Sequence, residues 1–191
     1  MDTLFGFVGK DYVLVAADRA AQFSIVKLLD SDDKITELDG NKLLAAGGDT
    51  ADRINFSDLM QKNIHLYYYR NSVKLTTEST ANFIRTVISE NLRKKPAFAD
   101  LLIGGIDNEP GLYYLDYLGV MQKVRKAAHG HAGHFLYGLM DNWWKPDLTL
   151  DEGKEIARKC IEQVRTRFLI NQRKFVVKVV SKDGITLLDF D

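Results

Sequence analysis

Residues 1–18, MDTLFGFVGKDYVLVAAD, contain two apolar runs separated by a short polar turn. The runs cover residues 3–8 and 12–17, and the turn covers residues 9–11, Gly-Lys-Asp. This pattern predicts a β-hairpin, and the absence of charge in the second run before Asp18 predicts a buried strand. No signal-peptide pattern precedes the hairpin, so we expect the chain to begin with a core strand and to carry no propeptide.

The composition favours one domain over residues 1–191, because a chain of this length buries enough surface for a single core. Lys plus Arg and Asp plus Glu both number 26, so the formal net charge is zero. This balance gives no basic surface for nucleic acid or an anionic membrane, and no apolar run reaches the ~20 residues that span a bilayer. The single cysteine, Cys160, excludes an intramolecular disulfide and suits a reducing compartment.

The rest of the chain predicts strands and helices in separate blocks. Residues 19–33 lack periodicity and are interpreted as an exposed loop, Asp49 as a helix cap, and Thr149 with Glu152 as a capping box. Strands are expected at residues 34–38, 42–46, 99–106, 112–118, 122–128, 174–180 and 185–188, and helices at 50–69, 77–94, 130–144 and 149–170. Separate blocks argue against alternating βαβ units and predict an α+β fold, with two stacked antiparallel sheets covered by helices on both outer faces.

Residues 129–134, HGHAGH, are the most concentrated group of possible metal ligands. The spacing of His129, His131 and His134 is similar to the H-x-H-x-D-H pattern of dinuclear zinc hydrolases, but Gly133 stands where the carboxylate would be. The fourth histidine, His65, has no second ligand nearby in sequence. We interpret the cluster as a glycine-rich junction with exposed or first-turn histidines, and a metal hydrolase is the weaker alternative.

Other candidate sites have structural explanations. The glycine pairs 47–48 and 104–105 lack the spacing of phosphate-binding loops and are expected to allow close packing. Cys160 lies at helical spacing among apolar residues, which favours a buried side chain over a nucleophile. Asp18 and Lys34 end and begin two predicted strands, so they can meet as a structural ion pair or as a lysine that serves a nucleophile.

The first hairpin with Asp18, Lys34 sixteen residues later, and Gly48 in AAGGD together resemble the beta subunits of the 20S proteasome. Four further stretches, KNIHLYYYRN, GLYYLDYLG, AAHG and RKCIEQVRTRFLIN, are similar to the non-catalytic beta-4 position of the eukaryotic ring, also called beta type-2. The resemblance covers essentially the whole chain. It implies the four-layer αββα sandwich of the N-terminal nucleophile hydrolases.

The resemblance also implies which residues would carry the family's chemistry, an acyl transfer by an N-terminal threonine. The supporting aspartate matches Asp18, the lysine matches Lys34, and the glycine whose amide stabilises the oxyanion matches Gly48. The nucleophile position falls on Asp2, which has no hydroxyl. Thr3 is one residue late, and a shift of one residue in a strand turns the side chain to the opposite face.

Further family positions are also altered. The two serines of the family's Gly-Ser-Gly-Ser segment fall on His131 and Gly133, and its later aspartate and serine fall on Phe168 and Asn171. The resemblance therefore implies a non-catalytic subunit with no catalytic, cofactor-binding or metal-binding residues. We expect Asp18 and Lys34 to persist as a buried ion pair. The alternative is an active threonine hydrolase after trimming to Thr3.

The partners implied by the resemblance are beta subunits of the same and the opposing ring, alpha-ring subunits, and transient polypeptide substrate in the chamber, without nucleic acid or membrane. The implied location is cytoplasm and nucleus. The aromatic residues 67–69 and 143–144 are candidate interface anchors, or they pack inside the domain.

Overall fold

The predicted N-terminal hairpin lies within one of two stacked antiparallel sheets. A computed structural model describes residues 2–23, 26–170 and 172–190. Sheet 1 has the strand order β10-β1-β2-β11-β12, and sheet 2 has the order β5-β6-β7-β8-β9. The bounds in sheet 1 are β1 (Leu4–Val8), β2 (Tyr12–Asp18), β10 (Lys126–His129), β11 (Phe175–Ser181) and β12 (Gly184–Leu188). Those in sheet 2 are β5 (Ile35–Asp39), β6 (Lys42–Gly48), β7 (Ala99–Ile106), β8 (Pro110–Leu115) and β9 (Met121–Val124).

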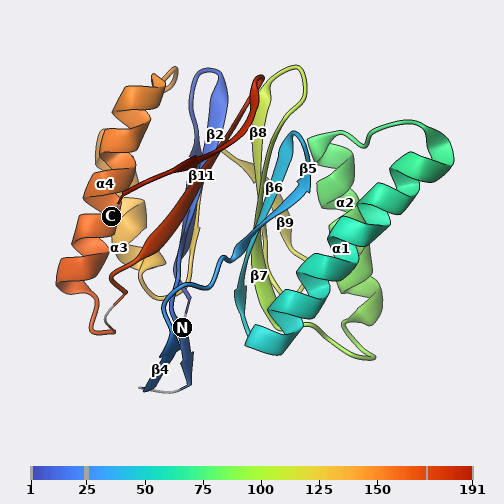
Figure 1. Ribbon diagram of the computed structural model, residues 1–191, viewed down its shortest axis with the longest axis horizontal. Helices are drawn as coiled ribbons and strands as arrows, with labels where there is room; N and C mark the ends of the chain where they lie inside the picture. The colour runs from blue at the N-terminus through green and yellow to red at the C-terminus, as the bar shows by residue number, and fades with distance from the viewer. Residues whose placement is uncertain (1, 24–25, 171, 191) are drawn as a thin grey trace.

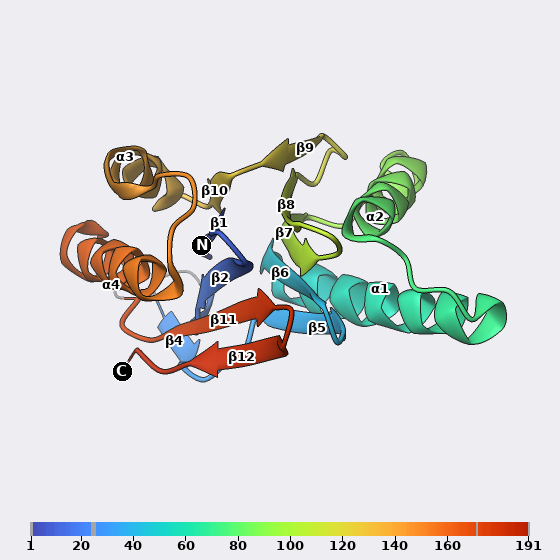
Figure 2. The same ribbon diagram turned by 90° about the horizontal axis from the view of Figure 1, so that it is seen from above.

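Helices cover the outer face of each sheet, as Figures 1 and 2 show. The pair α3 (Gly133–Trp143) and α4 (Leu150–Arg167) packs on sheet 1, and the pair α1 (Thr50–Asn71) and α2 (Thr77–Asn91) packs on sheet 2. The predicted αββα arrangement is therefore confirmed. None of the helices in the described ranges combines the length and the hydrophobicity that a membrane-spanning segment requires.

The continuous apolar run of β2 is explained by burial on both faces. Successive side chains of a strand point to opposite sides. Tyr12, Leu14 and Ala16 face the core beneath α3 and α4, and Val13 and Val15 face the core between the two sheets. A third core lies between sheet 2 and the helices α1 and α2. Strand β2 thus contributes to two of the three hydrophobic layers.

The predicted helix caps are confirmed. The Asp49 carboxylate accepts hydrogen bonds from two amides of the first turn of α1. At the start of α4, the Thr149 hydroxyl accepts from the Glu152 amide and the Glu152 carboxylate accepts from the Thr149 amide, which forms the capping box.

Two predicted segments are wrong. Residues 19–33 are not a simple loop, because β3 (Ala21–Phe23) and β4 (Val26–Leu29) form a separate two-stranded sheet. All four residues of β4 are exposed, so no alternation of polar and apolar residues signals the strand. Residues 122–128 are not one strand, since the chain leaves sheet 2 after β9 and enters sheet 1 at β10. The break is at Arg125, whose carbonyl accepts a hydrogen bond from the Val8 amide.

Several boundaries also differ from the predictions. The strand expected at residues 112–118 ends at Leu115, because the Asp116 carboxylate accepts hydrogen bonds from the amides of Leu118 and Val120 and closes a turn. The helix expected from residue 130 begins at Gly133, since Gly130 has a φ of 83° that is incompatible with a right-handed helix.

Candidate functional site

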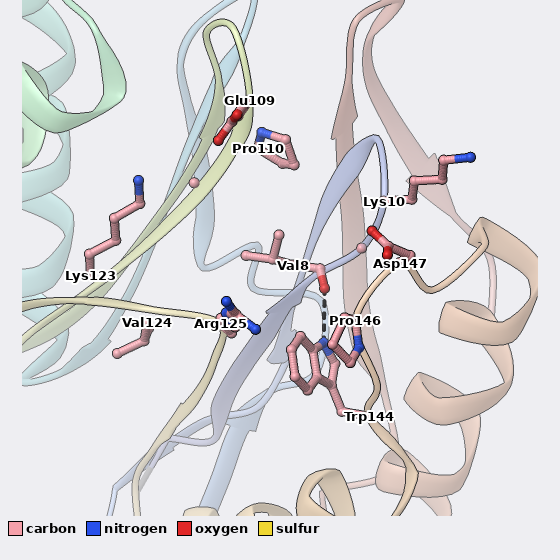
Figure 3. A pocket seen from close by; sticks show the side chains of 12 residues that line it. Val8, Lys10, Glu109, Pro110, Lys123, Val124, Arg125, Trp144, Pro146 and Asp147 are labelled. Atoms are coloured by element: carbon pink, nitrogen blue, oxygen red, sulfur yellow. Dashed lines mark hydrogen bonds between the residues drawn. The ribbon is translucent and has the colours of Figure 1, made fainter.

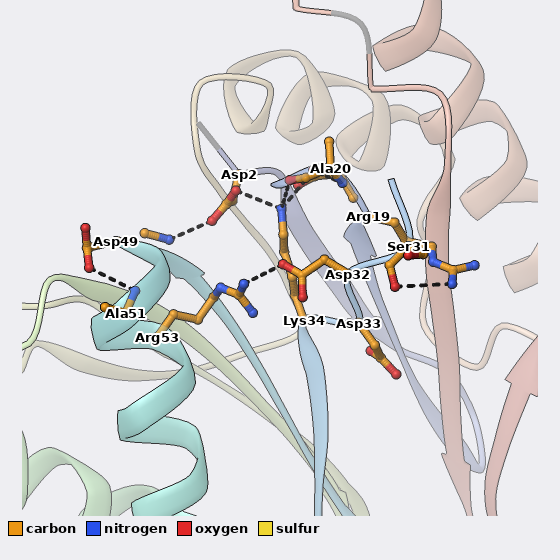
Figure 4. A network of polar contacts seen from close by, with 12 residues as sticks. Asp2, Arg19, Ala20, Ser31, Asp32, Asp33, Lys34, Asp49, Ala51 and Arg53 are labelled. Carbon is orange, nitrogen blue, oxygen red and sulfur yellow. Dashed lines mark hydrogen bonds and ion pairs between the residues drawn. The ribbon is translucent and has the colours of Figure 1, made fainter. Parts of the chain in front are cut away.

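Lys34 lies at the centre of a polar network at the end of the sandwich where β1 begins (Figure 4). Its ammonium donates to Asp2 Oδ1 at 2.7 Å, to Asp18 Oδ2 at 2.8 Å and to the Ala20 carbonyl at 2.8 Å. Asp18 is the last residue of β2 in sheet 1, and Lys34 directly precedes β5 in sheet 2. The stacking of the two sheets therefore brings the predicted pair together. All three donors of the ammonium are used.

The Asp18 carboxylate is fully buried and accepts more than the bond from Lys34. The amides of Thr3 and Ala20 donate to its two oxygens at 2.7 and 3.0 Å. Burial raises the pKa of this carboxyl, while the Lys34 ammonium and the hydrogen bond from Thr3 act in the opposite direction. The Asp18–Lys34 pair joins the two sheets and also fixes the backbone at the start of β1.

Asp2 occupies the remaining side of the network. One of its carboxylate oxygens binds Lys34, and the other accepts a hydrogen bond from the Gly48 amide at 2.9 Å. Gly48 has a φ of 129°, and a Cβ there would overlap the Phe98 carbonyl oxygen, so only glycine fits this backbone. The Lys34 ammonium and the Gly48 amide, which the resemblance assigned to the family's lysine and oxyanion glycine, are thus both bound to the chain's own Asp2.

Thr3 faces a different environment from Asp2. Its side chain is buried, and its hydroxyl donates to Gln172 Oε1 at 2.6 Å. Because its neighbour Asp2 contacts Lys34 and Gly48, the two side chains diverge as the strand geometry predicts. Gln172 and Ala20 were not predicted as part of this site. No sequence signal identifies them, since one lies 169 residues from Thr3 and the other contributes only its backbone.

The other family positions carry no hydroxyl among the described residues. His131 is exposed, and Gly133 is the buried first residue of α3. Phe168 follows α4 and packs against the core beneath α3 and α4. Asn171 lies outside the described residues.

The three clustered histidines do not converge. His129 is buried, and its Nε2 donates to the Leu101 carbonyl at 3.0 Å, whereas His131 and His134 are exposed. The interpretation of all three as exposed or first-turn residues is therefore wrong for His129. Its ring stacks on Tyr114 at a centroid distance of 4.1 Å, and burial lowers its pKa. In the described ranges, no three His, Cys, Asp or Glu side chains gather as a metal site, and His65 is exposed on α1.

The remaining candidates have the predicted packing roles. A Cβ on Gly104 would lie 2.9 Å from Val13, and one on Gly105 would lie 2.5 Å from the Thr77 hydroxyl, so both glycines permit close contact. Cys160 is buried in the core beneath α3 and α4, and burial raises the pKa of its thiol to about 12. A thiol with that pKa is not a thiolate nucleophile at neutral pH.

A cavity of about 670 Å³ lies at the opposite end of β1, beside Val8 and Gly9 (Figure 3). Its other lining residues come from the turn between β1 and β2, from the turn into β8 and the start of that strand, from the segment where β9 passes to β10, and from the loop between α3 and α4. Among the described residues that line it there is no hydroxyl, thiol or imidazole side chain.

Comparison with known proteins gives a family match over almost the whole chain. The family described as "Proteasome subunit" matches residues 2–180. The chain belongs to the proteasome subunit family. A proteasome subunit beta type-2 from Dictyostelium discoideum is 42% identical, with 100% of this chain and 98% of the relative covered. The corresponding rice subunit is 39% identical over 96% of this chain and 88% of its own length. A proteasome subunit beta type-4 from Saccharomyces cerevisiae is 33% identical over 99% of this chain and 98% of its own length.

Membership in the proteasome family confirms the resemblance that the sequence motifs carried. The similarity to beta type-2 and type-4 proteasome subunits agrees with the non-catalytic beta position expected from residues 62–71 and 111–119. The αββα sandwich is the N-terminal nucleophile hydrolase fold of this family.

Proposed function

We propose that the chain is a non-catalytic, structural beta subunit of the 20S proteasome core particle. The observation that carries this proposal is the position of Asp2. Its carboxylate binds both Lys34 and the Gly48 amide, and the resemblance assigns position 2 to the family's threonine nucleophile. Peptide hydrolysis is performed by sister beta subunits, and this subunit supports the assembly and its chamber for ATP- and ubiquitin-dependent protein degradation.

The chemistry of the network supports a structural role. A threonine hydroxyl attacks a peptide carbonyl after losing its proton, whereas a carboxylate held by an ammonium and an amide has no such proton to transfer. The Lys34 ammonium is fully used as a donor, and the Gly48 amide is bound to Asp2 instead of a reacting oxygen. We propose accordingly that the chain has no catalytic, cofactor-binding or metal-binding residues.

The alternative, an active hydrolase trimmed to Thr3, is not favoured. The Thr3 amide binds the Asp18 carboxylate, and the Thr3 hydroxyl binds Gln172. Bringing this hydroxyl to Lys34 and Gly48 would require breaking both bonds and shifting β1 by one residue, which would reverse the inward and outward sides of the strand. The register of β1 against β2 and β10 opposes that shift.

Assembly with other proteasome subunits follows from this function. We propose neighbours in the same beta ring, in the opposing beta ring and in an alpha ring, with polypeptide substrate passing through the chamber. Exposed aromatic side chains offer contact surfaces: Tyr69 is 79% exposed on α1, and Trp143 is 36% exposed on α3. Trp144 is a weaker anchor, since its Nε1 donates to the Val8 carbonyl within the domain. We also propose one domain over residues 1–191, cytoplasmic and nuclear location, and no binding of nucleic acid or membrane.

The test is to purify a tagged form of the chain from its own cells and to measure the native mass of the complex. We expect the chain in a core particle with sister subunits. The particle is then treated with a peptide electrophile that reacts with N-terminal threonine, and the intact mass of each subunit is measured. Active sister subunits should gain the mass of the electrophile, and this chain should not. A free, active monomer or an adduct on Thr3 would refute the proposal.

A further inference from the structure

The Lys34 ammonium and the Gly48 amide together form a two-point site for a carboxylate. The two donors bind different oxygens of the same group, at 2.7 Å and 2.9 Å. Bonds of this kind to an ionised acceptor are stronger than bonds between neutral groups, and two donors fix the orientation of a planar carboxylate. In this chain, the carboxylate that fills the site comes from Asp2.

The surroundings of Asp2 fit a group of this size closely. A Cβ built on Gly47 would lie 3.1 Å from the Asp2 Cβ, so the glycine backbone packs against the Asp2 methylene. On the other side, a Cβ on Gly130 would overlap the Asp2 carbonyl oxygen, so the Asp2 backbone is also held close. The Asp2 side chain is 14% exposed, while that of Lys34 is 1% exposed. The site is therefore enclosed around the Lys34 ammonium and open to solvent on the side of Gly48, which is an exposed residue.

We propose that Asp2 is a built-in ligand, and that the site between Lys34 and Gly48 binds a free monocarboxylate once the Asp2 carboxylate is removed. In the unaltered chain, covalent attachment gives Asp2 a high effective concentration, and free carboxylates do not displace it. The inference depends on the contacts of Asp2 and goes beyond the structural role of the subunit. It assigns a ligand class, small monocarboxylates, to a site that the chain keeps filled.

Two substitutions give matched pairs of variant and ligand. In Asp2→Ala, the methylene carbon remains and formate replaces the missing carboxylate. In Asp2→Gly, the methylene is also lost and acetate replaces all the missing heavy atoms. Acetate has one carbon too many for Asp2→Ala, because Gly47 already packs against that position. Asp2→Gly should thus prefer acetate, and Asp2→Ala should prefer formate.

The experiment measures thermal unfolding of the full chain in sodium formate, acetate or chloride at equal ionic strength. Both variants should unfold at a lower temperature than the unaltered chain in chloride. For a matched anion with a Kd of about 10 mM, about 100 mM ligand raises the ratio of folded to unfolded chain about 11-fold, which corresponds to a Tm increase of about 3–6 °C. The unaltered chain should show no preference among the three anions.

Two further variants control the result. Asp58→Ala removes a carboxylate from the exposed pair with Lys62 and should give no response specific to formate. Asp2→Asn fills the space without the charge, so it should be less stable than the unaltered chain and insensitive to all three anions. The amide resonance of Gly48 should shift on titration of Asp2→Ala with formate, which places the anion at the site.

Three results would overturn the proposal. The first is that Asp2→Asn is as stable as the unaltered chain, because then the carboxylate is not needed as a ligand. The second is that formate and acetate act alike on both variants or act equally on Asp58→Ala, which would show a general salt effect. The third is that Asp2→Ala folds in neither formate nor chloride, because a matched anion should restore the lost contacts.

Discussion

Replacing Lys34 with methionine tests the interpretation of the network as a buried ion pair. Methionine keeps the length of the side chain and removes the ammonium. The substitution deletes three contacts of 2.7–2.8 Å, to Asp2, Asp18 and the Ala20 carbonyl. The fully buried Asp18 carboxylate would then keep only its two amide donors, with the Asp2 charge nearby.

The expected loss of stability is about 3–5 kcal/mol, the usual result of leaving one partner of a buried pair without its counter-charge. For a chain of this size, this loss lowers the Tm by about 6–20 °C. Lys62→Met is the matched control, because Lys62 and Asp58 form an ion pair whose side chains are 70% and 53% exposed. That substitution should change stability by about 0.5 kcal/mol or less.

The pH dependence provides a second measurement. Burial raises the pKa of Asp18, and Lys34→Met should raise it further because the main opposing charge is lost. As the pH falls, a carboxyl whose pKa is raised in the folded state takes up its proton at a higher pH in the folded chain than in the unfolded chain. The difference in unfolding free energy between Lys34→Met and the unaltered chain should therefore be largest at pH values above the raised pKa. It should shrink as the pH falls toward the ordinary carboxyl pKa of ~3.9.

Urea unfolding of the full chain at several pH values, followed by circular dichroism, measures both effects. Asp18→Asn combined with Lys34→Met removes both charges and should recover a large part of the stability. If Lys34→Met unfolds within about 1 kcal/mol of the unaltered chain and still enters the core particle, then the ion-pair explanation for the retention of Lys34 is wrong. A loss that does not change with pH would equally refute it.

Three further predictions concern single residues. His129 is buried with a lowered pKa, so as the pH falls the unfolded chain takes up a proton at this residue before the folded chain does. Below pH 6.5, the free energy of unfolding should therefore decrease by up to about 1.4 kcal/mol per pH unit. His129→Gln should reduce this pH dependence, as measured by urea unfolding at several pH values. Parallel slopes would contradict the assignment. Thr149→Ala removes the N-cap of α4 and should cost about 0.5–2 kcal/mol, measured by thermal unfolding; an unchanged Tm would show that the cap is not needed. Gly130→Ala places a side chain at a φ of 83°, against the Asp2 carbonyl, and should cost at least about 1–3 kcal/mol. Its control, Gly138→Ala, has open space within α3 and should stabilise the chain by about 0.5–1 kcal/mol, so equal effects would refute the packing argument.

Local sequence patterns predicted much of this fold, because turns and helix caps depend on interactions between residues that are close in sequence. The hairpin of β1 and β2 follows from two apolar runs with a turn between them, and its register pairs Val8 with Val13 as that turn requires. The caps of α1 and α4 follow from the hydrogen-bonding capacity of Asp49 and Thr149 at their first turns. Two strands escaped prediction, since β3 and β4 are short and β4 is exposed along its length.

The break between β9 and β10 also escaped prediction, for a different reason. Residues 122–128 read as one strand, and nothing local marks Arg125 as the point where the chain passes from sheet 2 to sheet 1. The division depends on which strand lies beside each half, and that choice is made by pairing with β8 and β1. Sheet membership is a property of distant neighbours.

The sequence by itself determined that residue 2 is an aspartate without a hydroxyl and that Asp18, Lys34 and Gly48 are present, and its motifs carried the resemblance to the proteasome subunit family. Only the tertiary structure decided where the Asp2 carboxylate points. It binds Lys34, which directly precedes β5 of sheet 2, and Gly48, the last residue of β6 in the same sheet, while Asp2 precedes a strand of sheet 1. Residue types and spacing fix which groups are available, whereas the stacking of two sheets fixes which of them come within hydrogen-bonding distance.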